Sequence, residues 1–209
     1  MKKILLTLAC LLGAITLSAQ STPDNSQSEK LVTIGIRAGL NIANYSGHSF
    51  DGLKSKCGFV GGISADFALS KYFYINSGLF LSMNGAKYNG YSEKINLSPI
   101  YLKIPVMPSL RYRFNKNVQW QLNFGPYFAY GIGGKAQVDL KGIGKADEDF
   151  FSEEGGGKRF DVGLGVGTGI TYKKVYFGLE YNFGLTSIGR YDDVDGKNRA
   201  FAISLGYNF

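Results

Sequence analysis

The stretch Arg199-Ala200-Phe201-Ala202-Ile203-Ser204-Leu205-Gly206-Tyr207-Asn208-Phe209 alternates large and small side chains. Its odd-numbered positions from Phe201 onward are bulky and apolar, and the even-numbered positions between them are small or polar. Successive side chains of a β-strand point to opposite faces, so a period of two residues indicates a strand. The stretch therefore predicts a strand with one apolar face and one nearly bare face.

The same alternation recurs upstream, most clearly over 175–186 and 160–170. Weaker versions predict strands at about 118–134, 98–114, 72–87, 57–69 and 31–42, and no segment has a convincing helical period. Together these make eight strands. The predicted fold is all-β, an eight-stranded antiparallel up-and-down transmembrane β-barrel with a small and polar lumen and a lipid-facing apolar exterior.

The connections between the predicted strands alternate in length. Short turns fall at Ser70-Lys71, Asn115–Asn117 and Lys173-Lys174. Long polar connections, which we expect to be loops, cover residues 43–56, 88–97, 135–158 and 190–198. Barrels of the bacterial outer membrane have this asymmetry, with tight turns on the periplasmic side and longer loops outside.

Charged residues distinguish a membrane barrel from a soluble one. Within the predicted strands the charges share the parity of the glycines: they are Arg37, Asp66, Lys103, Arg111, Arg113, Asp161 and Glu180. A soluble barrel of lipocalin type would carry its charges outside. An apolar face on every strand is what hydrocarbon requires. We therefore interpret the charges as a salt-bridged polar network that fills the lumen; the alternative is a proton or solute path.

Composition agrees with this interpretation. The chain has 209 residues, 44% of them hydrophobic, and a mean hydropathy of −0.06, which excludes a polytopic helical membrane protein. Glycine is abundant at 29 residues. An eight-stranded barrel has little interior space, so long lumen residues such as Arg111, Arg113 and Tyr127 need small neighbours. The glycines from Gly163 to Gly169 would provide that room.

The N-terminus predicts export. Lys2 and Lys3 precede an apolar stretch that ends in small residues, which is typical of a secretory signal peptide. We expect residues 1–19 to be the signal, with cleavage between Ala19 and Gln20, then a polar periplasmic segment at 20–30 and the barrel at 31–209. Cleavage would leave Cys57 as the last cysteine, which excludes an intramolecular disulfide, and would lower the net charge from +7 to +5.

Three prolines test the barrel. Pro105, Pro108 and Pro126 lie inside predicted strands, where proline cannot donate a ladder hydrogen bond, and a closed barrel has no free edge. We expect bulges at these positions. The alternation keeps its phase on both sides of Pro105 and Pro108.

Several segments resemble the PorT-type outer membrane β-barrel domain found in Bacteroidetes. They are Ile36–Asn41, Tyr101-Leu102-Lys103-Ile104-Pro105, Gly125-Pro126-Tyr127, Tyr181–Leu185 and Leu205–Phe209. The resemblance covers essentially the mature chain and implies an eight-stranded barrel with no generally known catalytic residue. It also implies that Phe209 belongs to the signal that the outer membrane barrel assembly machinery reads.

The loops offer few candidates for chemistry. His48 lies near Ser49 and Asp51, and some lipid-modifying barrels use a His with a Ser at the outer rim, but a solvated loop histidine is the simpler interpretation. The run Tyr191–Gly196 lacks the ligand positions of an EF-hand. We predict no catalytic residue, no cofactor, no metal and no nucleic-acid partner.

Three functions remain open. The leading hypothesis is a non-enzymatic outer membrane barrel that stabilises the envelope or binds an external partner through its loops. The second is an accessory component of a secretion or transport assembly, which would bind its partner through the loop at 135–158. The third is an enzyme that modifies lipid A. The expected surroundings are outer membrane lipid and the barrel assembly machinery.

Overall fold

The computed structural model describes residues 31–47, 52–90, 93–140, 144–153, 156–189 and 196–209. The strands are β1 (Val32–Ser46), β2 (Lys54–Ala68), β3 (Phe73–Met83), β4 (Ala86–Asn89), β5 (Glu93–Arg113), β6 (Val118–Leu140), β7 (Gly144–Asp149), β8 (Phe160–Tyr172), β9 (Val175–Ser187) and β10 (Lys197–Asn208). No helix in the described part of the chain is long and apolar enough to cross a membrane.

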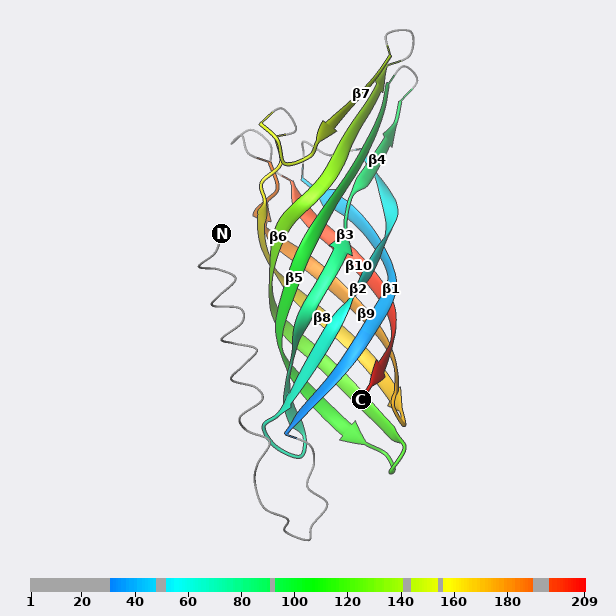
Figure 1. Ribbon diagram of the computed structural model, residues 1–209, viewed down its shortest axis with the longest axis vertical. Coiled ribbons are helices and arrows are strands. Elements are labelled where there is room, and N and C mark those ends of the chain that lie inside the picture. The colour runs from blue at the N-terminus through cyan, green and yellow to red at the C-terminus, as the bar shows by residue number, and fades with distance from the viewer. Residues whose placement is uncertain (1–30, 48–51, 91–92, 141–143, 154–155, 190–195) are drawn as a thin grey trace.

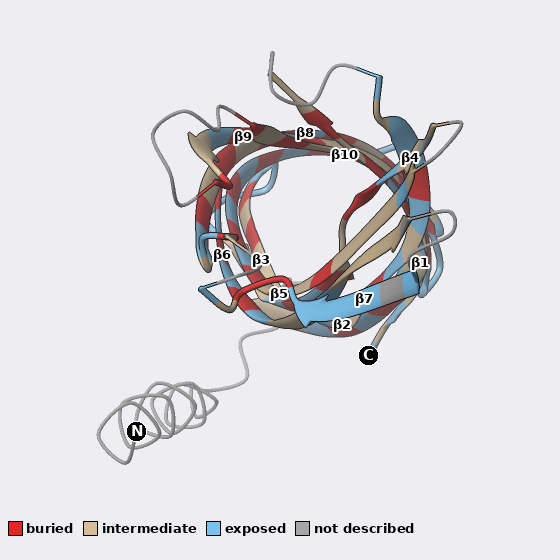
Figure 2. Cartoon of the chain, turned by 90° about the horizontal axis from the view of Figure 1, so that it is seen from above, coloured by how far each residue is buried: buried red, intermediate tan, exposed pale blue. Residues whose placement is uncertain are grey.

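Eight of these strands form a closed antiparallel ring. Each of β1, β2, β3, β5, β6, β8, β9 and β10 pairs with the next in this order. The ring closes where β10 returns to β1, in a register that runs from Gly35 opposite Asn208 to Ser46 opposite Lys197. Figure 1 shows the tilted strands, and Figure 2 shows the ring from above. The predicted eight-stranded barrel is confirmed.

The two remaining strands belong to an extension beyond one end of the ring. β4 follows β3 after Asn84 and Gly85, and it pairs with the neighbours of β3, which are β2 and β5. β7 pairs with the far part of β6. Because β5 and β6 have 21 and 23 residues, they are about twice as long as a transmembrane strand needs to be. Together with β4 and β7 they rise above the other strands in Figure 1.

This extension corrects the predicted loops. Residues 88–97 and 135–158 were expected to be loops, yet β4, β5, β6 and β7 occupy much of both ranges. β1 likewise continues to Ser46, and β2 begins at Lys54, inside the expected loop 43–56. The sequence pattern missed these parts because strands above the membrane have no lipid-facing side and therefore lack apolar alternation.

The two faces of the barrel wall differ as the strand parity predicts. The outward positions carry exposed apolar side chains, among them Leu40 (59% exposed), Phe124 (58%) and Leu205 (59%). The inward positions carry buried polar side chains, among them Asn41, Asn123 and Asn182. An apolar outer surface around a polar interior suits a wall immersed in hydrocarbon.

The prolines are accommodated without the predicted bulges. The β5–β6 ladder is interrupted between the pairs Pro105–Tyr127 and Ser109–Asn123, and the register is the same on both sides. The one register shift between these strands lies elsewhere, at Ile100 and Tyr101. On the other side of β5, the β3–β5 ladder is interrupted between the pairs Ser77–Val106 and Phe80–Lys103, and there the Ser77 hydroxyl donates to the Pro105 carbonyl at 2.8 Å. The expectation of bulges at the prolines was wrong. The expectation that the alternation keeps its phase on both sides of Pro105 and Pro108 was right.

Glycines on β8 make room for rings in the lumen. A Cβ atom on Gly163 would lie 2.5 Å from the Tyr127 ring, and one on Gly169 would lie 2.5 Å from the Tyr176 ring. Both distances are shorter than any normal carbon contact. Large side chains from β6 and β9 therefore occupy space that only glycine on β8 leaves open.

Candidate functional site

The interior toward the short-turn end centres on Asp66 of β2. Its carboxylate pairs with Arg111 of β5, Nη2 to Oδ1 at 2.6 Å, and with Arg37 of β1, Nη2 to Oδ2 at 3.5 Å. The Asn76 side-chain amide donates to Asp66 Oδ1 at 2.5 Å. Asp66 is only 1% exposed. One carboxylate thus forms ion pairs with two guanidinium groups, which come from strands on both sides of it.

Aromatic rings complete this layer. The Arg37 guanidinium lies over the Tyr176 ring at 4.2 Å from its centroid, and Arg111 lies over Tyr74 at 4.4 Å. A guanidinium is attracted by the face of an aromatic ring, and the attraction is stronger away from water. Each arginine is therefore held between a carboxylate and a ring.

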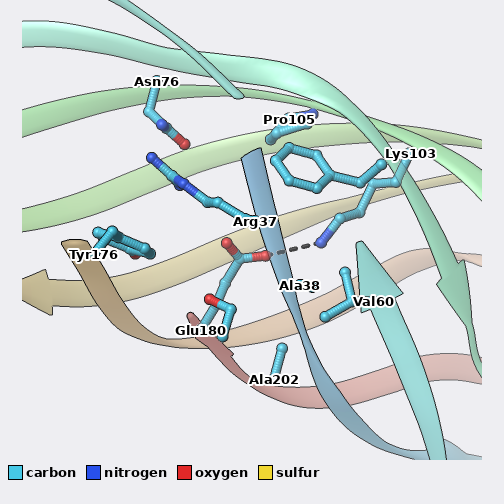
Figure 3. A pocket seen from close by; sticks show the side chains of 11 residues that line it. Arg37, Ala38, Val60, Asn76, Lys103, Pro105, Tyr176, Glu180 and Ala202 are labelled. Carbon is cyan, nitrogen blue, oxygen red and sulfur yellow. Dashed lines mark hydrogen bonds and ion pairs between the residues drawn. The ribbon is translucent and has the colours of Figure 1, made fainter. Parts of the chain in front are cut away.

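A third ion pair spans the lumen nearer its middle. Lys103 Nζ of β5 lies 2.8 Å from Glu180 Oε1 of β9, and the Asn182 amide donates to the same oxygen at 3.0 Å. Figure 3 shows the two side chains pointing toward each other beside Arg37. The cavity between these groups has a volume of about 30 Å³, which is room for one or two water molecules.

Asp161 of β8 organises the third polar cluster. It accepts hydrogen bonds from Thr186 (2.8 Å), the Asn198 amide (2.9 Å) and the Tyr127 hydroxyl (3.1 Å). The cavity at this level has a volume of about 10 Å³. The Asp161 carboxylate is thus hydrogen-bonded by neutral donors only, and Asp161 is 2% exposed. The lumen is thus filled at three levels.

An aromatic cluster closes the outer mouth of the barrel. Phe150 and Phe151, just after β7, are 4% and 2% exposed and contact each other edge to face. Phe151 also meets Tyr101 of β5 edge to face at 5.5 Å, and its ring occupies the space beside Gly131. The cluster also includes Tyr45 and Ile188. We call the segment Phe150-Phe151 the aromatic cap.

The extension carries a groove outside the barrel. It has a volume of about 300 Å³ and is lined by Lys87, Lys94, Ile95, Asn96, Gln137, Val138, Asp139 and Asp147. Asn96 donates to Gln137 at 2.9 Å, and Gln137 donates to Asp147 at 3.2 Å, so side-chain amides bridge β5, β6 and β7. We call this the outer groove. One wall is basic and the other is acidic.

The predicted lumen residues do not all lie in the network. Arg37, Asp66, Lys103, Arg111, Asp161 and Glu180 line the interior and are paired as described above. Arg113 has the same parity but is exposed, because it is the last residue of β5. Phe209 lies beside Tyr207, and its backbone N–H donates to Ile34 at 2.9 Å. Its role as an assembly signal stays a prediction.

Other candidates fall outside the described residues. These are the cleavage site Ala19/Gln20, the loop histidine His48 and Asp192, Asp193 and Asp195 of the fourth loop. In the described part of the chain, no three His, Cys, Asp or Glu side chains are grouped to hold a metal ion. Cys57 is exposed, on the outward face of β2.

Comparison with known families identifies the class of protein. Residues 18–190 match the model of the outer membrane protein β-barrel domain. The chain belongs to this family. It is therefore an outer membrane protein. Barrels of the outer membrane have short periplasmic turns and longer external loops, so we expect the short-turn end to face the periplasm and the extension to face outward.

Solved structures of outer membrane barrels resemble this family member in fold alone. The attachment invasion locus protein Ail of Yersinia pestis is 16% identical, with 85% of this chain and 98% of Ail covered and a TM-score of 0.42. Neisserial surface protein A is 19% identical, with 84% of this chain and 97% of that protein covered and a TM-score of 0.45. No curated protein matches the sequence.

Proposed function

We propose that this barrel is a non-enzymatic surface protein of the outer membrane that binds a polypeptide partner through its extension. The observation that carries the proposal is the difference in free volume between the lumen and the outer groove. The lumen clusters enclose cavities of about 30 and 10 Å³, whereas the outer groove has about 300 Å³. Solute passage needs continuous space along the barrel axis, and a filled lumen does not provide it.

The chemistry of the outer groove suits a polypeptide. Its amide side chains can donate to and accept from a peptide backbone, and its lysines and carboxylates can pair with side chains of either sign. β7 also pairs with β6 alone among the described strands, so its other edge can accept an extended segment. The subgroup we infer is the PorT type, on the basis of the sequence resemblance; that resemblance implies no catalytic residue.

A photocrosslinking residue placed in the groove tests the proposal. We would replace Val138 in the groove and, as a matched control, Phe59 on the lipid-facing side of β2. We expect one discrete protein to crosslink through position 138 and not through position 59. The captured protein should then bind the purified barrel and lose affinity for the variant Lys87→Glu/Lys94→Glu.

The identity of the captured protein separates the hypotheses. An extracellular or surface protein supports binding to an external partner. A component of an envelope secretion system would instead assign the barrel as an accessory subunit. Equal capture through positions 138 and 59, or none, would contradict the proposal. The lipid-modifying alternative depends on His48, which lies outside the described residues, so no described contact favours it.

A further inference from the structure

Four side chains form a row across the outer groove. Lys87 of β4 lies opposite Asn96 of β5. Asn96 lies in turn opposite Gln137 of β6, and Gln137 lies opposite Asp147 of β7. Residues directly opposite each other in neighbouring strands share one face of the sheet. The groove therefore runs across the four strands of the extension, with Lys87 at one end and Asp147 at the other.

Hydrogen bonds along this row all run in one direction. The ammonium of Lys56, a buried residue of β2, donates to Asn96 Oδ1 at 2.7 Å. The Asn96 amide donates to Gln137 Oε1 at 2.9 Å, and the Gln137 amide donates to Asp147 Oδ1 at 3.2 Å. An ammonium only donates and a carboxylate only accepts, so the two ends of this chain fix the orientation of both amides.

The charged groups at the two ends of the row are accessible to a ligand. In the described part of the chain Lys87 and Lys94, which line the groove together, are exposed and form no ion pair. Lys54 of β2 is exposed opposite Lys87 and extends the positive end. Asp147 is exposed, and among the described residues it accepts only from Gln137. The row is therefore positive at β4 and negative at β7.

The length of the row sets the spacing of the charges that complement it. Neighbouring strands lie about 4.8 Å apart, so the three spacings from β4 to β7 amount to about 14 Å. An extended chain advances about 3.3 Å per residue and points every second side chain to the same face. Side chains four residues apart thus share a face and lie about 13 Å apart. A segment of this kind reaches both ends of the row.

We propose that the outer groove selects an extended polypeptide segment in which an acidic and a basic residue are four positions apart. The acidic side chain pairs with Lys87, and the basic side chain pairs with Asp147. Each amide nitrogen of Asn96 and Gln137 has two donors and one acceptor side chain in the row, so it can also donate to a backbone carbonyl of the segment. This inference rests on the proposed function and adds the sequence feature that the groove recognises.

Fluorescent synthetic peptides with blocked ends and the purified full-length protein in detergent test this selection. The matching peptide has the sequence Glu-Ser-Thr-Ser-Lys. The permuted peptide Glu-Ser-Lys-Ser-Thr has the same composition, but its two charges are only two positions apart. We expect the wild type to bind the matching peptide about threefold more tightly, because the permuted peptide reaches one end of the row only. Added salt should weaken this preference.

Two groove variants should change which peptide binds best. The variant Asp147→Lys makes both ends of the row basic, so we expect it to prefer Glu-Ser-Thr-Ser-Glu. The variant Lys87→Glu/Lys94→Glu makes both ends acidic, so we expect it to prefer Lys-Ser-Thr-Ser-Lys. The matched control Lys71→Glu/Lys116→Glu changes two exposed lysines on the short turns and should keep the wild-type order.

Heat-modifiable migration in detergent gels confirms that each variant contains a folded barrel. Equal binding of the matching and permuted peptides by the wild type would overturn the inference, and so would groove variants that keep the wild-type order. Binding of none of the peptides would overturn it as well. The crosslink through position 138 decides the proposed function separately in each of these cases, because capture of a protein does not depend on the order of charges.

Discussion

Lys103 of β5 and Glu180 of β9 join opposite parts of the barrel wall, with 2.8 Å between Nζ and Oε1. Two strands, β6 and β8, lie between β5 and β9 in the ring, so this ion pair crosses the lumen. The Asp66 cluster lies toward the short turns, and the Asp161 cluster lies toward the extension. Polar contacts inside the barrel thus connect strands that share no backbone hydrogen bond.

Replacing Lys103 by Met should destabilise the barrel strongly. The Lys103 side chain is 10% exposed and that of Glu180 is 25% exposed, so the substitution leaves a carboxylate in a site with little water. Removing one partner of a buried ion pair typically costs about 3 kcal/mol or more. Urea unfolding in lipid vesicles, followed through the fluorescence of Trp120, would measure the loss.

The double variant Lys103→Met/Glu180→Gln provides the control. It removes both charges, so we expect it to be more stable than Lys103→Met alone. The two side chains are not coupled if the loss in free energy of unfolding in the double variant equals the sum of the losses in Lys103→Met and Glu180→Gln.

The substitution Asp66→Asn should affect assembly more than any other change in the lumen. It removes the counterion of both Arg37 and Arg111 and leaves two guanidinium groups in a buried layer. We expect little or no heat-modifiable protein in the membrane fraction, since uncompensated buried charge costs several kcal/mol. Asp147→Asn in the exposed part of β7 is the matched control and should assemble normally.

Sequence alone was sufficient to predict the barrel wall, because hydrocarbon imposes a strict rule on it. Every strand that crosses the membrane needs apolar residues on alternate positions, and Phe201 to Phe209 follow this rule without exception. The same parity placed Asp66, Lys103 and Glu180 on the inner face. Which charges pair could not be predicted, since pairing depends on the tilt and register of strands far apart in sequence.

The extension and the aromatic cap were not predicted, for a different reason. Strands above the membrane, such as β7 with the sequence Gly-Lys-Ala-Asp-Glu-Asp, have no lipid face and look like a polar loop. Phe150 and Phe151 were the available signal for the aromatic cap, because two adjacent phenylalanines are unusual in a solvated loop. Arg113 was misplaced because parity gives the side of a strand but not the distance from its end.

The substitution Gly169→Ala should destabilise the barrel through Tyr176. Its Cβ atom would lie 2.5 Å from the Tyr176 ring, which itself contacts the Arg37 guanidinium. Overpacking of this kind typically costs about 1 to 3 kcal/mol. Gly133→Ala on β6 is the matched control, because no atom lies within 4 Å of the added Cβ position. Urea midpoints that are equal for the two variants would contradict the steric role of Gly169.

Removal of the aromatic cap should loosen the outer mouth without opening a channel. In the variant Phe150→Ala/Phe151→Ala, Arg159 loses the ring that its guanidinium contacts at 5.1 Å. The segment after β7 also loses two buried aromatic side chains. We expect trypsin to cleave after Lys158 or Arg159 much faster than in the wild type, since proteolysis follows local opening. Gel electrophoresis of the fragments, with heat-modifiable migration of the remaining barrel, measures this.

Conductance in planar bilayers tests whether the cap or the polar clusters seal the lumen. Below the cap, Asp161 and its partners, the Lys103–Glu180 pair and the Asp66 cluster still fill the cross-section. We therefore expect no ion conductance from either the wild type or the capless variant, because ions need a continuous aqueous path. A conductance that appears only in the capless variant would mean that the polar clusters leave a path and that Phe150 and Phe151 are the seal.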